Sequence, residues 1–109
     1  MVKIEAALDG DGVLRSCGAS GHAARGQDGG SVACAAISVL MRTAARVLSG
    51  RPGIRSRCEA PEPGFLFLEA DFEAEGRDFL FAAGVFLLEG LASVAEDYPE
   101  HCSLSIRRI

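Results

Sequence analysis

The sequence predicts a single α+β domain over residues 1–109, in which an antiparallel or mixed sheet carries two helices. Short segments alternate apolar and polar residues, two longer segments place apolar residues at helical spacing, and turns rich in Gly, Pro or Asp separate them. The predicted order is ββαββαβ. A chain of 109 residues is long enough for one hydrophobic core and too short for two.

The first two strands are predicted to form a hairpin. Between Val2 and Leu8, apolar residues alternate with Lys3 and Glu5, as in a half-buried strand. Residues 9–12 contain two Asp-Gly steps, the preferred sequence of a tight turn. We therefore expect the returning strand at Val13–Ala19.

A helix is expected after the glycine-rich loop that follows this hairpin. Apolar residues recur there every three or four positions. They are Ala33, Ile37, Leu40, Met41, Ala44, Val47 and Leu48. Arg42, Thr43 and Arg46 occupy the other side. Gly50 and Pro52 then end the helix.

The second half of the chain repeats this pattern and adds a strand. Ile54–Ala60 and Phe65–Glu73 flank a Pro-Glu-Pro-Gly turn and read as a second hairpin. The ten apolar residues of Phe79–Leu88 are too few to cross a bilayer, which takes about 20. We expect them to form a deeply buried helix that continues to about Asp97. Alternation from Cys102 predicts the closing strand.

Two glycines inside the second helix suggest close packing. Gly84 and Gly90 each cost about 1 kcal/mol relative to alanine, so a near backbone contact would explain them. We expect this helix to pack on the sheet and also on a partner subunit, which makes a homodimer a reasonable prediction.

Composition restricts the location and the cofactors. The N-terminus lacks the basic and apolar regions of a signal peptide, so we expect a cytoplasmic protein that does not bind a membrane. The four cysteines show no Cys-x-x-Cys spacing, which favours reduced thiols over disulfides or zinc. No metal or cofactor is predicted. Cys17, Cys58 and Cys102 lie in strand patterns, and we expect them to be buried.

Charge argues against nucleic acid as a partner. The net charge is −4, so a nucleic-acid binder would need a local basic face. The best candidate contains no lysine and no interleaved aromatic residue. It comprises Arg42, Arg46, Arg51, Arg55 and Arg57. We expect no direct nucleic-acid binding.

The stretch SGHAARGQDGGSVACAAIS places His22 and Cys34 twelve residues apart on either side of the glycine-rich loop. Ser31 stands where an N-cap is expected, which would place Cys34 in the first helical turn. The positive end of the helix favours a thiolate there. The N–H groups of Cys34 and Ala35 could then hold an oxyanion.

A structural interpretation of the same residues remains open at this point. A cysteine in VACAAIS is often a small core residue, and a lone histidine is often a loop or capping residue. Ser38 shares a helix face with Cys34 and could line a pocket or bond back to a helix carbonyl. The loop lacks the lysine and Ser/Thr of a phosphate-binding loop, so we discount nucleotide binding.

The residues SGHA, a glycine-containing loop and VACAAIS closely resemble the ribosomal-processing cysteine protease Prp family, also called YsxB-like. Gly21, His22 and Ala23 match the start of the family pattern, and residues 34–38 match its end. The resemblance implies an endopeptidase with Cys34 as nucleophile and His22 as base. It also implies a homodimer that removes the N-terminal extension of large-subunit ribosomal protein twenty-seven during ribosome assembly.

One difference from the family pattern concerns the third catalytic residue. The family usually carries an aspartate three residues before the cysteine, where this chain has Ser31. Serine can cap a helix but supplies no negative charge to orient a protonated histidine. Asp28, earlier in the loop, is a candidate substitute. We therefore expect a weaker dependence on a third residue than in a full triad.

Two other functions remain open. Ser31 is compatible with a non-catalytic, ribosome-associated interaction module of the same fold. A thiol-based redox or acyl-carrying protein is the second alternative. The absence of a resolving cysteine near Cys34 in the sequence argues against it.

Overall fold

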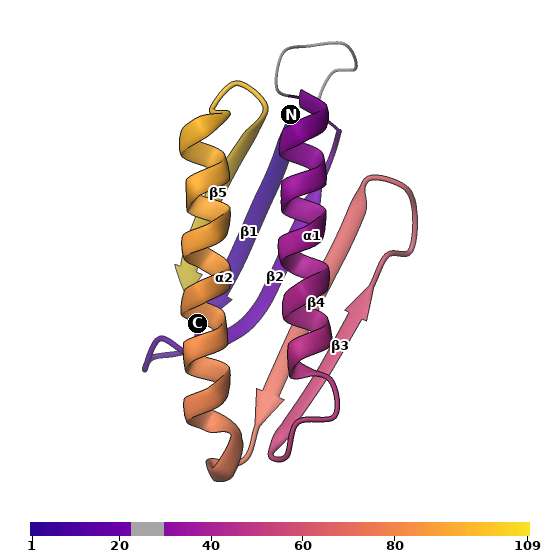
Figure 1. The fold of residues 1–109 in the computed structure, drawn as a ribbon. Helices are drawn as coiled ribbons and strands as arrows, with labels where there is room; N and C mark the ends of the chain where they lie inside the picture. The colour runs from indigo at the N-terminus through magenta and orange to yellow at the C-terminus, as the bar shows by residue number, and fades with distance from the viewer. Residues whose placement is uncertain (23–29) are drawn as a thin grey trace.

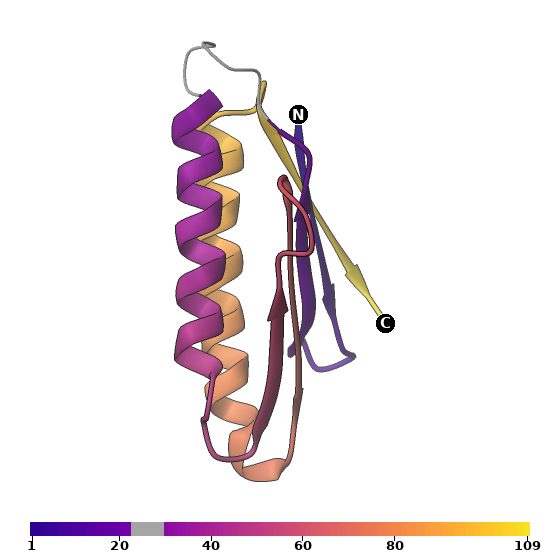
Figure 2. The same cartoon turned by 90° about the vertical axis from the view of Figure 1, so that its right-hand side faces the viewer.

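The computed structural model describes residues 1–22 and 30–109. Two long helices lie side by side on one face of a five-stranded sheet, and no described element covers its other face (Figures 1 and 2). The order of elements confirms the predicted ββαββαβ. It is β1 (Val2–Leu8), β2 (Leu14–Ser20), α1 (Gly30–Leu48), β3 (Ile54–Glu59), β4 (Phe65–Phe72), the short 3₁₀ helix η1 (Ala74–Gly76), α2 (Arg77–Asp97) and β5 (Cys102–Arg108).

The sheet is mixed, with the strand order β3-β4-β2-β1-β5. β1 pairs in parallel with β5, and every other neighbouring pair is antiparallel. β2 pairs with β4 from the second hairpin, so the two hairpins form one continuous sheet. This pairing brings the end of β2 at Ser20 beside the start of β4 at Phe65, next to the site described below.

The first hairpin forms at the predicted Asp-Gly turn. The Asp9 carboxylate accepts hydrogen bonds from the backbone amides of Asp11 (2.9 Å) and Val13 (3.0 Å). The Val13 amide is the main cause of a lowered pKa of Asp9. Because these bonds use Val13 in the turn, β2 begins at Leu14, one residue later than predicted.

Each helix buries one face and exposes the other. In α1, the buried side chains include Ala33, Ile37 and Met41, as the spacing predicts. In α2, however, the expectation of a deeply buried helix is wrong in part, because Phe86 is 76% exposed and Val85 is 45% exposed. The helices form a single layer, and none of the residues that the structure describes covers the faces turned away from the sheet (Figure 2).

The two helical glycines are explained by contacts within the chain. A Cβ added at Gly84 would lie 2.8 Å from the Cβ of Leu14 in β2, and one at Gly90 would lie 3.0 Å from Leu40 in α1. Both sites therefore need glycine for close packing, as predicted. The partners are this chain's own sheet and helix, so the glycines are no argument for a dimer.

Both helices are long and apolar enough to pass a length-and-composition test for membrane spans. The apolar content of each helix is also explained by the fold, because the side chains that face the sheet form the hydrophobic core. Leu80, Leu87 and Leu91 of α2 are at most 2% exposed and pack with Ile4 of β1 in one hydrophobic cluster.

The cysteines divide into buried and accessible thiols. Cys17 and Cys102 are buried, as predicted, and burial raises the pKa of Cys17 to about 12. The expectation for Cys58 is wrong: its side chain is exposed, because it lies near the end of the edge strand β3, where residues 57–59 are all exposed. Cys34 is partly exposed at the margin of the core.

Candidate active site

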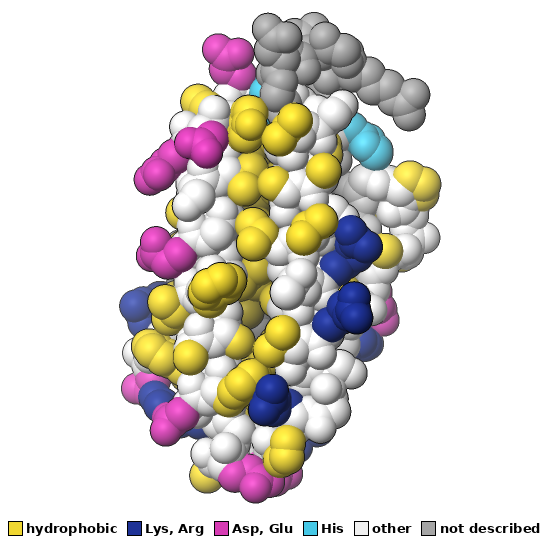
Figure 3. All heavy atoms as spheres, in the orientation of Figure 1, with side chains coloured by type: hydrophobic (Ala, Val, Ile, Leu, Met, Phe, Trp, Pro, Cys, Tyr) yellow, Lys and Arg dark blue, Asp and Glu magenta, His cyan; other side chains and the backbone are white. Residues whose placement is uncertain are grey.

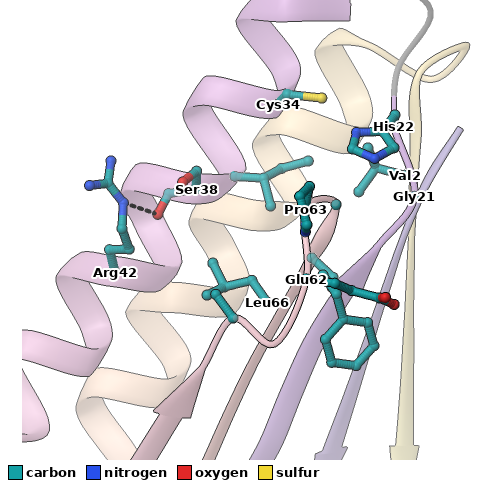
Figure 4. A pocket seen from close by; sticks show the side chains of 14 residues that line it. Val2, Gly21, His22, Cys34, Ser38, Arg42, Glu62, Pro63 and Leu66 are labelled. Atoms are coloured by element: carbon teal, nitrogen blue, oxygen red, sulfur yellow. Dashed lines mark hydrogen bonds between the residues drawn. The ribbon is translucent and has the colours of Figure 1, made fainter.

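A pocket of about 350 Å³ opens between the first half of α1 and the tip of the β3–β4 hairpin (Figure 4). Four of the six predicted site residues line it: Gly21, His22, Cys34 and Ser38. The chain folds so that the end of β2 meets the side of α1 here. His22 and Cys34, twelve residues apart in sequence, thereby reach the same cavity.

Cys34 presents its sulfur to this pocket. The sulfur points away from the helix axis toward the side on which His22 lies (Figure 4). The side chain is partly exposed and packs only against the margin of the core. The interpretation of Cys34 as a fully buried core residue is therefore wrong, and a reagent or an extended peptide has a route to the sulfur.

The start of the helix differs from the prediction. α1 begins at Gly30, so Ser31 lies inside the first turn and is not the N-cap, and Cys34 begins the second turn. In such a helix the N–H groups from about the fifth residue onward bond within the helix. The expected use of the Cys34 and Ala35 amides as an oxyanion hole is therefore wrong for this helix. Ser31 is exposed and does not line the pocket, and Asp28 lies outside the described residues.

His22 is held at the end of β2 by backbone contacts on both sides. The amide of Gly21 donates to the carbonyl oxygen of Gly64 (2.9 Å), and the nitrogen of Met1 donates to the carbonyl oxygen of His22 (3.0 Å). Gly21 has φ +100°, and a Cβ there would overlap the Met1 carbonyl. Glycine is therefore required immediately before the histidine.

One stripe of α1 forms the helical wall of the pocket. Cys34, Ser38 and Arg42 follow one another at intervals of four residues and all line the cavity. The Nε of Arg42 donates to the carbonyl oxygen of Ser38 (3.3 Å), and the guanidinium is exposed at the rim (Figure 4). The Ser38 hydroxyl forms no hydrogen bond with any part of the chain that the structure describes. Its placement confirms the pocket-lining alternative.

The hairpin tip forms the opposite wall, and the sequence analysis assigned it only a turn. Ala60, Glu62, Pro63 and Gly64 all face the cavity. The Phe65 amide donates to the Glu62 carbonyl oxygen (3.2 Å). Proline at the second position and glycine with φ +82° at the third fit a type II turn. The Pro-Glu-Pro-Gly sequence was the available signal, but it specified only the turn.

Apolar side chains make up the rest of the pocket. Val2 from β1, Ile37 from α1 and Leu66 from β4 line its floor. This lining suits an apolar side chain beside the sulfur. Among residues 1–22 and 30–109, no group of three or more side chains is arranged to hold a metal ion.

The five arginines proposed as a basic face do not form one. Arg55 pairs with Asp71 and Glu73, and Arg57 pairs with Glu59 and Glu69, all on the sheet. Arg51 lies over the ring of Phe79, 3.9 Å from its centroid. Arg42 and Arg46 remain on α1, where the described residues offer them no acidic partner.

A second thiol lies near Cys34, contrary to the sequence interpretation. The pKa of Cys102 is raised first by burial and then by the charge of Cys34. Cys102 also donates a long hydrogen bond (3.6 Å) from its sulfur to the carbonyl oxygen of Tyr98. Its distance of 68 residues in sequence from Cys34 gave no indication of this proximity.

Comparison with known proteins identifies the family. Residues 1–103 match the model of the family described as cysteine protease Prp. The chain belongs to this family. The Prp assignment confirms the resemblance found at residues 21–23 and 34–38, and it makes the chain a member of a cysteine protease family. A search of curated proteins finds no match.

Solved structures share the Prp fold at low sequence identity. The essential ribosomal processing protease Prp from S. aureus, in complex with a substrate peptide, superposes with a TM-score of 0.82 at 18% identity, covering 98% of this chain and 100% of that one. Its complex with a covalently linked product peptide gives 0.81 at 18% identity with the same coverage. SMU.848 from Streptococcus mutans gives 0.80 at 20% identity, covering 100% of this chain and 96% of that one.

Proposed function

We propose that this chain is a cysteine endopeptidase that removes the N-terminal extension of large-subunit ribosomal protein twenty-seven, with Cys34 as nucleophile and His22 as base. One observation carries the proposal. A partly exposed cysteine and a histidine from different elements line the same open pocket, and the sulfur points toward the histidine's side (Figure 4). Membership in a cysteine protease family supports the same roles.

The reaction follows from these two groups. The imidazole of His22 takes the thiol proton, and the Cys34 thiolate attacks the carbonyl carbon of the scissile bond. The tetrahedral intermediate collapses to a thioester as His22 returns the proton to the leaving amine. Water, deprotonated by His22, then hydrolyses the thioester and releases the cut extension and the free thiol. Atoms and protons balance without a cofactor.

For the third residue of a triad, Glu62 is the one acidic residue that lines the pocket in the described part of the site, and its carboxylate forms no hydrogen bond or ion pair with His22 there. Ser31 is exposed and does not line the pocket, and its hydroxyl carries no charge. The nearest remaining candidate by sequence is Asp28. We propose that Asp28 contributes less than Cys34 and His22, so that Asp28→Ala keeps measurable cleavage whereas Cys34→Ala abolishes it.

The substrate is proposed to bind as an extended strand along the groove between α1 and the hairpin tip. An extended chain advances about 3.3 Å per residue, and one helical turn advances 5.4 Å. The stripe from Cys34 to Arg42 spans two turns or slightly more, and so faces about three or four substrate residues. Val2, Ile37 and Leu66 would hold apolar side chains close to the scissile bond.

The experiment is direct cleavage of the full-length precursor. Purified protein is incubated with the ribosomal protein carrying its extension, and mass spectrometry determines the new N-terminus. We expect one cut that yields the mature protein with wild type and Cys58→Ser, because Cys58 is exposed but outside the pocket. Cys34→Ser and His22→Ala should not cut. Binding of the precursor without any cut would instead support the non-catalytic interaction module.

We also propose that the protein works as a cytoplasmic homodimer joined through the outer faces of its helices. A groove of about 410 Å³ lies between α1 and α2, and almost all of its lining is apolar. Figure 3 shows hydrophobic side chains along both helices on this face. Phe86 borders the groove and is 76% exposed. Burial of such an apolar surface favours association of two copies.

A further inference from the structure

The imidazole of His22 lies directly against the backbone of Gly64. A Cβ built on Gly64 would overlap the ring, and its nearest atoms would be Nε2, Cε1 and Cδ2. A histidine ring is not a near contact at any other glycine whose surroundings the structure describes. The ring therefore occupies space that any side chain at residue 64 would take.

The position of the ring is fixed by more than this one contact. The Gly21 amide donates to the Gly64 carbonyl oxygen (2.9 Å), so the residue before His22 is tied to the same glycine. The Nε2 edge rests on Gly64, which leaves Nδ1 as the nitrogen on the far side of the ring from Gly64. One residue of the hairpin thus contacts both the backbone and the ring of the base segment.

A type II turn alone does not account for this arrangement. The turn requires φ > 0 at its third position, which glycine or asparagine provides. It does not require empty space above the Cα. Gly50 illustrates the difference, because it also has a positive φ (+71°) but has nothing within 4 Å of an added Cβ.

We infer that Gly64 is a positioning residue for the proposed catalytic base: its missing side chain sets the place and orientation of the His22 imidazole beside Cys34. This inference rests on the proposed roles of His22 and Cys34. It adds that the β3–β4 hairpin tip, besides forming the second pocket wall, holds the base in place. A side chain at residue 64 would displace the ring or the turn, and the imidazole would leave its present place in the pocket that it shares with Cys34.

The test compares Gly64→Ala and Gly64→Asn with Gly50→Ala. Asparagine tolerates the positive φ of the turn but carries the Cβ that overlaps His22. Gly50→Ala introduces similar backbone strain without a contact. The first measurement is the rate at which iodoacetamide alkylates Cys34 between pH 5 and 9, with each modified cysteine located by peptide mapping. Cys58, exposed and outside the pocket, is the internal reference.

We expect both Gly64 variants to lose the fast alkylation of Cys34 near neutral pH and to cut the precursor about 10²-fold more slowly, the scale associated with misplacing a catalytic group by about 1 Å. Gly50→Ala should keep the wild-type pH profile. A wild-type profile for Gly64→Asn would overturn the inference, because only the backbone conformation would then matter.

A second measurement does not depend on catalysis. The melting temperature is measured for Gly64→Ala, His22→Ala and the double variant. Without the imidazole the added methyl has room, so Gly64→Ala should lower the melting temperature less in the His22→Ala background. An equal fall in melting temperature in both backgrounds would show that the His22 ring does not occupy the space beside Gly64. If the wild type neither alkylates rapidly at Cys34 nor cuts the precursor, the proposed function is refuted. The melting temperatures of the single and double variants would still test the contact between Gly64 and His22.

Discussion

The amide of Gly21 donates a 2.9 Å hydrogen bond to the carbonyl oxygen of Gly64, which joins the end of β2 to the tip of the β3–β4 hairpin. This bond continues the pairing of β2 with β4 by one step beyond Ser20 and Phe65. It also sets where His22 leaves the sheet. The proposed base is thus attached to the second hairpin, and the proposed nucleophile is attached to α1.

Gly21→Ala should both destabilise the protein and slow cleavage. The residue has φ +100°, and an added Cβ would overlap the Met1 carbonyl. Backbone strain of this kind costs about 1–3 kcal/mol. Urea denaturation measures the loss. Gly10→Ala is the control, because nothing lies within 4 Å of its added Cβ. Equal denaturation midpoints for the two variants would contradict the assigned strain.

Accessibility predicts the order in which the cysteines react. In the native protein, iodoacetamide should modify Cys34 and Cys58, which are accessible, and leave Cys17 and Cys102 unmodified. Burial raises the pKa of Cys17 to about 12, so its reactive thiolate is scarce at neutral pH. In urea all four should react. Native labelling of Cys17 at the rate of Cys58 would show that the core is open in solution.

Reversal of the charge at Arg42 should change peptide preference. Arg42 lines the pocket, and the described residues give it no acidic partner, so its guanidinium is available to a substrate carboxylate. An exposed ion pair contributes about 0.2–1 kcal/mol. We expect Arg42→Glu to lower kcat/KM about 3- to 10-fold for peptides with an acidic residue three or four positions from the cut, and to raise it for lysine there.

Arg46→Glu is the matched control for this experiment. Arg46 lies one turn further along α1, outside the pocket that holds Cys34, and the substitution changes the net charge equally. It should leave the preference unchanged. The same shift in both variants would indicate a general effect of charge and exclude a specific contact at Arg42.

Phe86→Asp should prevent self-association. Phe86 is 76% exposed beside the apolar groove between the helices, so a carboxylate there would have to be desolvated in a dimer. Sedimentation velocity measures the oligomeric state. Ile109→Asp provides the control, because Ile109 is 62% exposed but lines a different pocket with Arg15 and Arg55. Dimers that persist in Phe86→Asp would place the interface elsewhere.

Asp71 should contribute stability that acid removes. Hydrogen bonding to Arg55 is the largest of several interactions that lower its pKa below 3.8 in the folded protein. A carboxyl group with a lower pKa when folded stabilises the protein above its unfolded pKa, and the contribution is lost as the pH falls through the folded value. Asp71→Asn should therefore reduce the urea midpoint at pH 7 and have a smaller effect at pH 3. Equal effects at both pH values would contradict this assignment.

Local sequence patterns predicted the helices, strands and turns of this fold. The strand order and the exposed face of α2 depend on long-range contacts, which these patterns do not show. The alternation in Val2–Leu8, the helical spacing after Ala33 and the Asp-Gly turn all gave the correct structures. Strand order could not be read from them, since the parallel pairing of β1 with β5 depends on contacts 100 residues apart, such as Val2 with Cys102. The exposure of Phe86 was missed for the same reason, because an apolar run does not show which of its faces is covered.

The site was predictable only in part. Gly21, His22, Cys34 and Ser38 meet in one pocket as predicted, because their motifs are local and lie at element ends. The hairpin wall was not predicted, since nothing in its turn sequence shows which residue packs on it. The helix start also differed: with α1 beginning at Gly30, Ser31 is not the cap.

The rate of Cys34 alkylation as a function of pH, compared between wild type and His22→Ala, tests the central claim most directly. If the His22 imidazole takes the thiol proton, wild-type Cys34 should react rapidly near neutral pH, and His22→Ala should react there about as slowly as Cys58. Identical profiles for the two proteins would show that His22 does not act on the sulfur, and the proposed catalytic pair would be wrong.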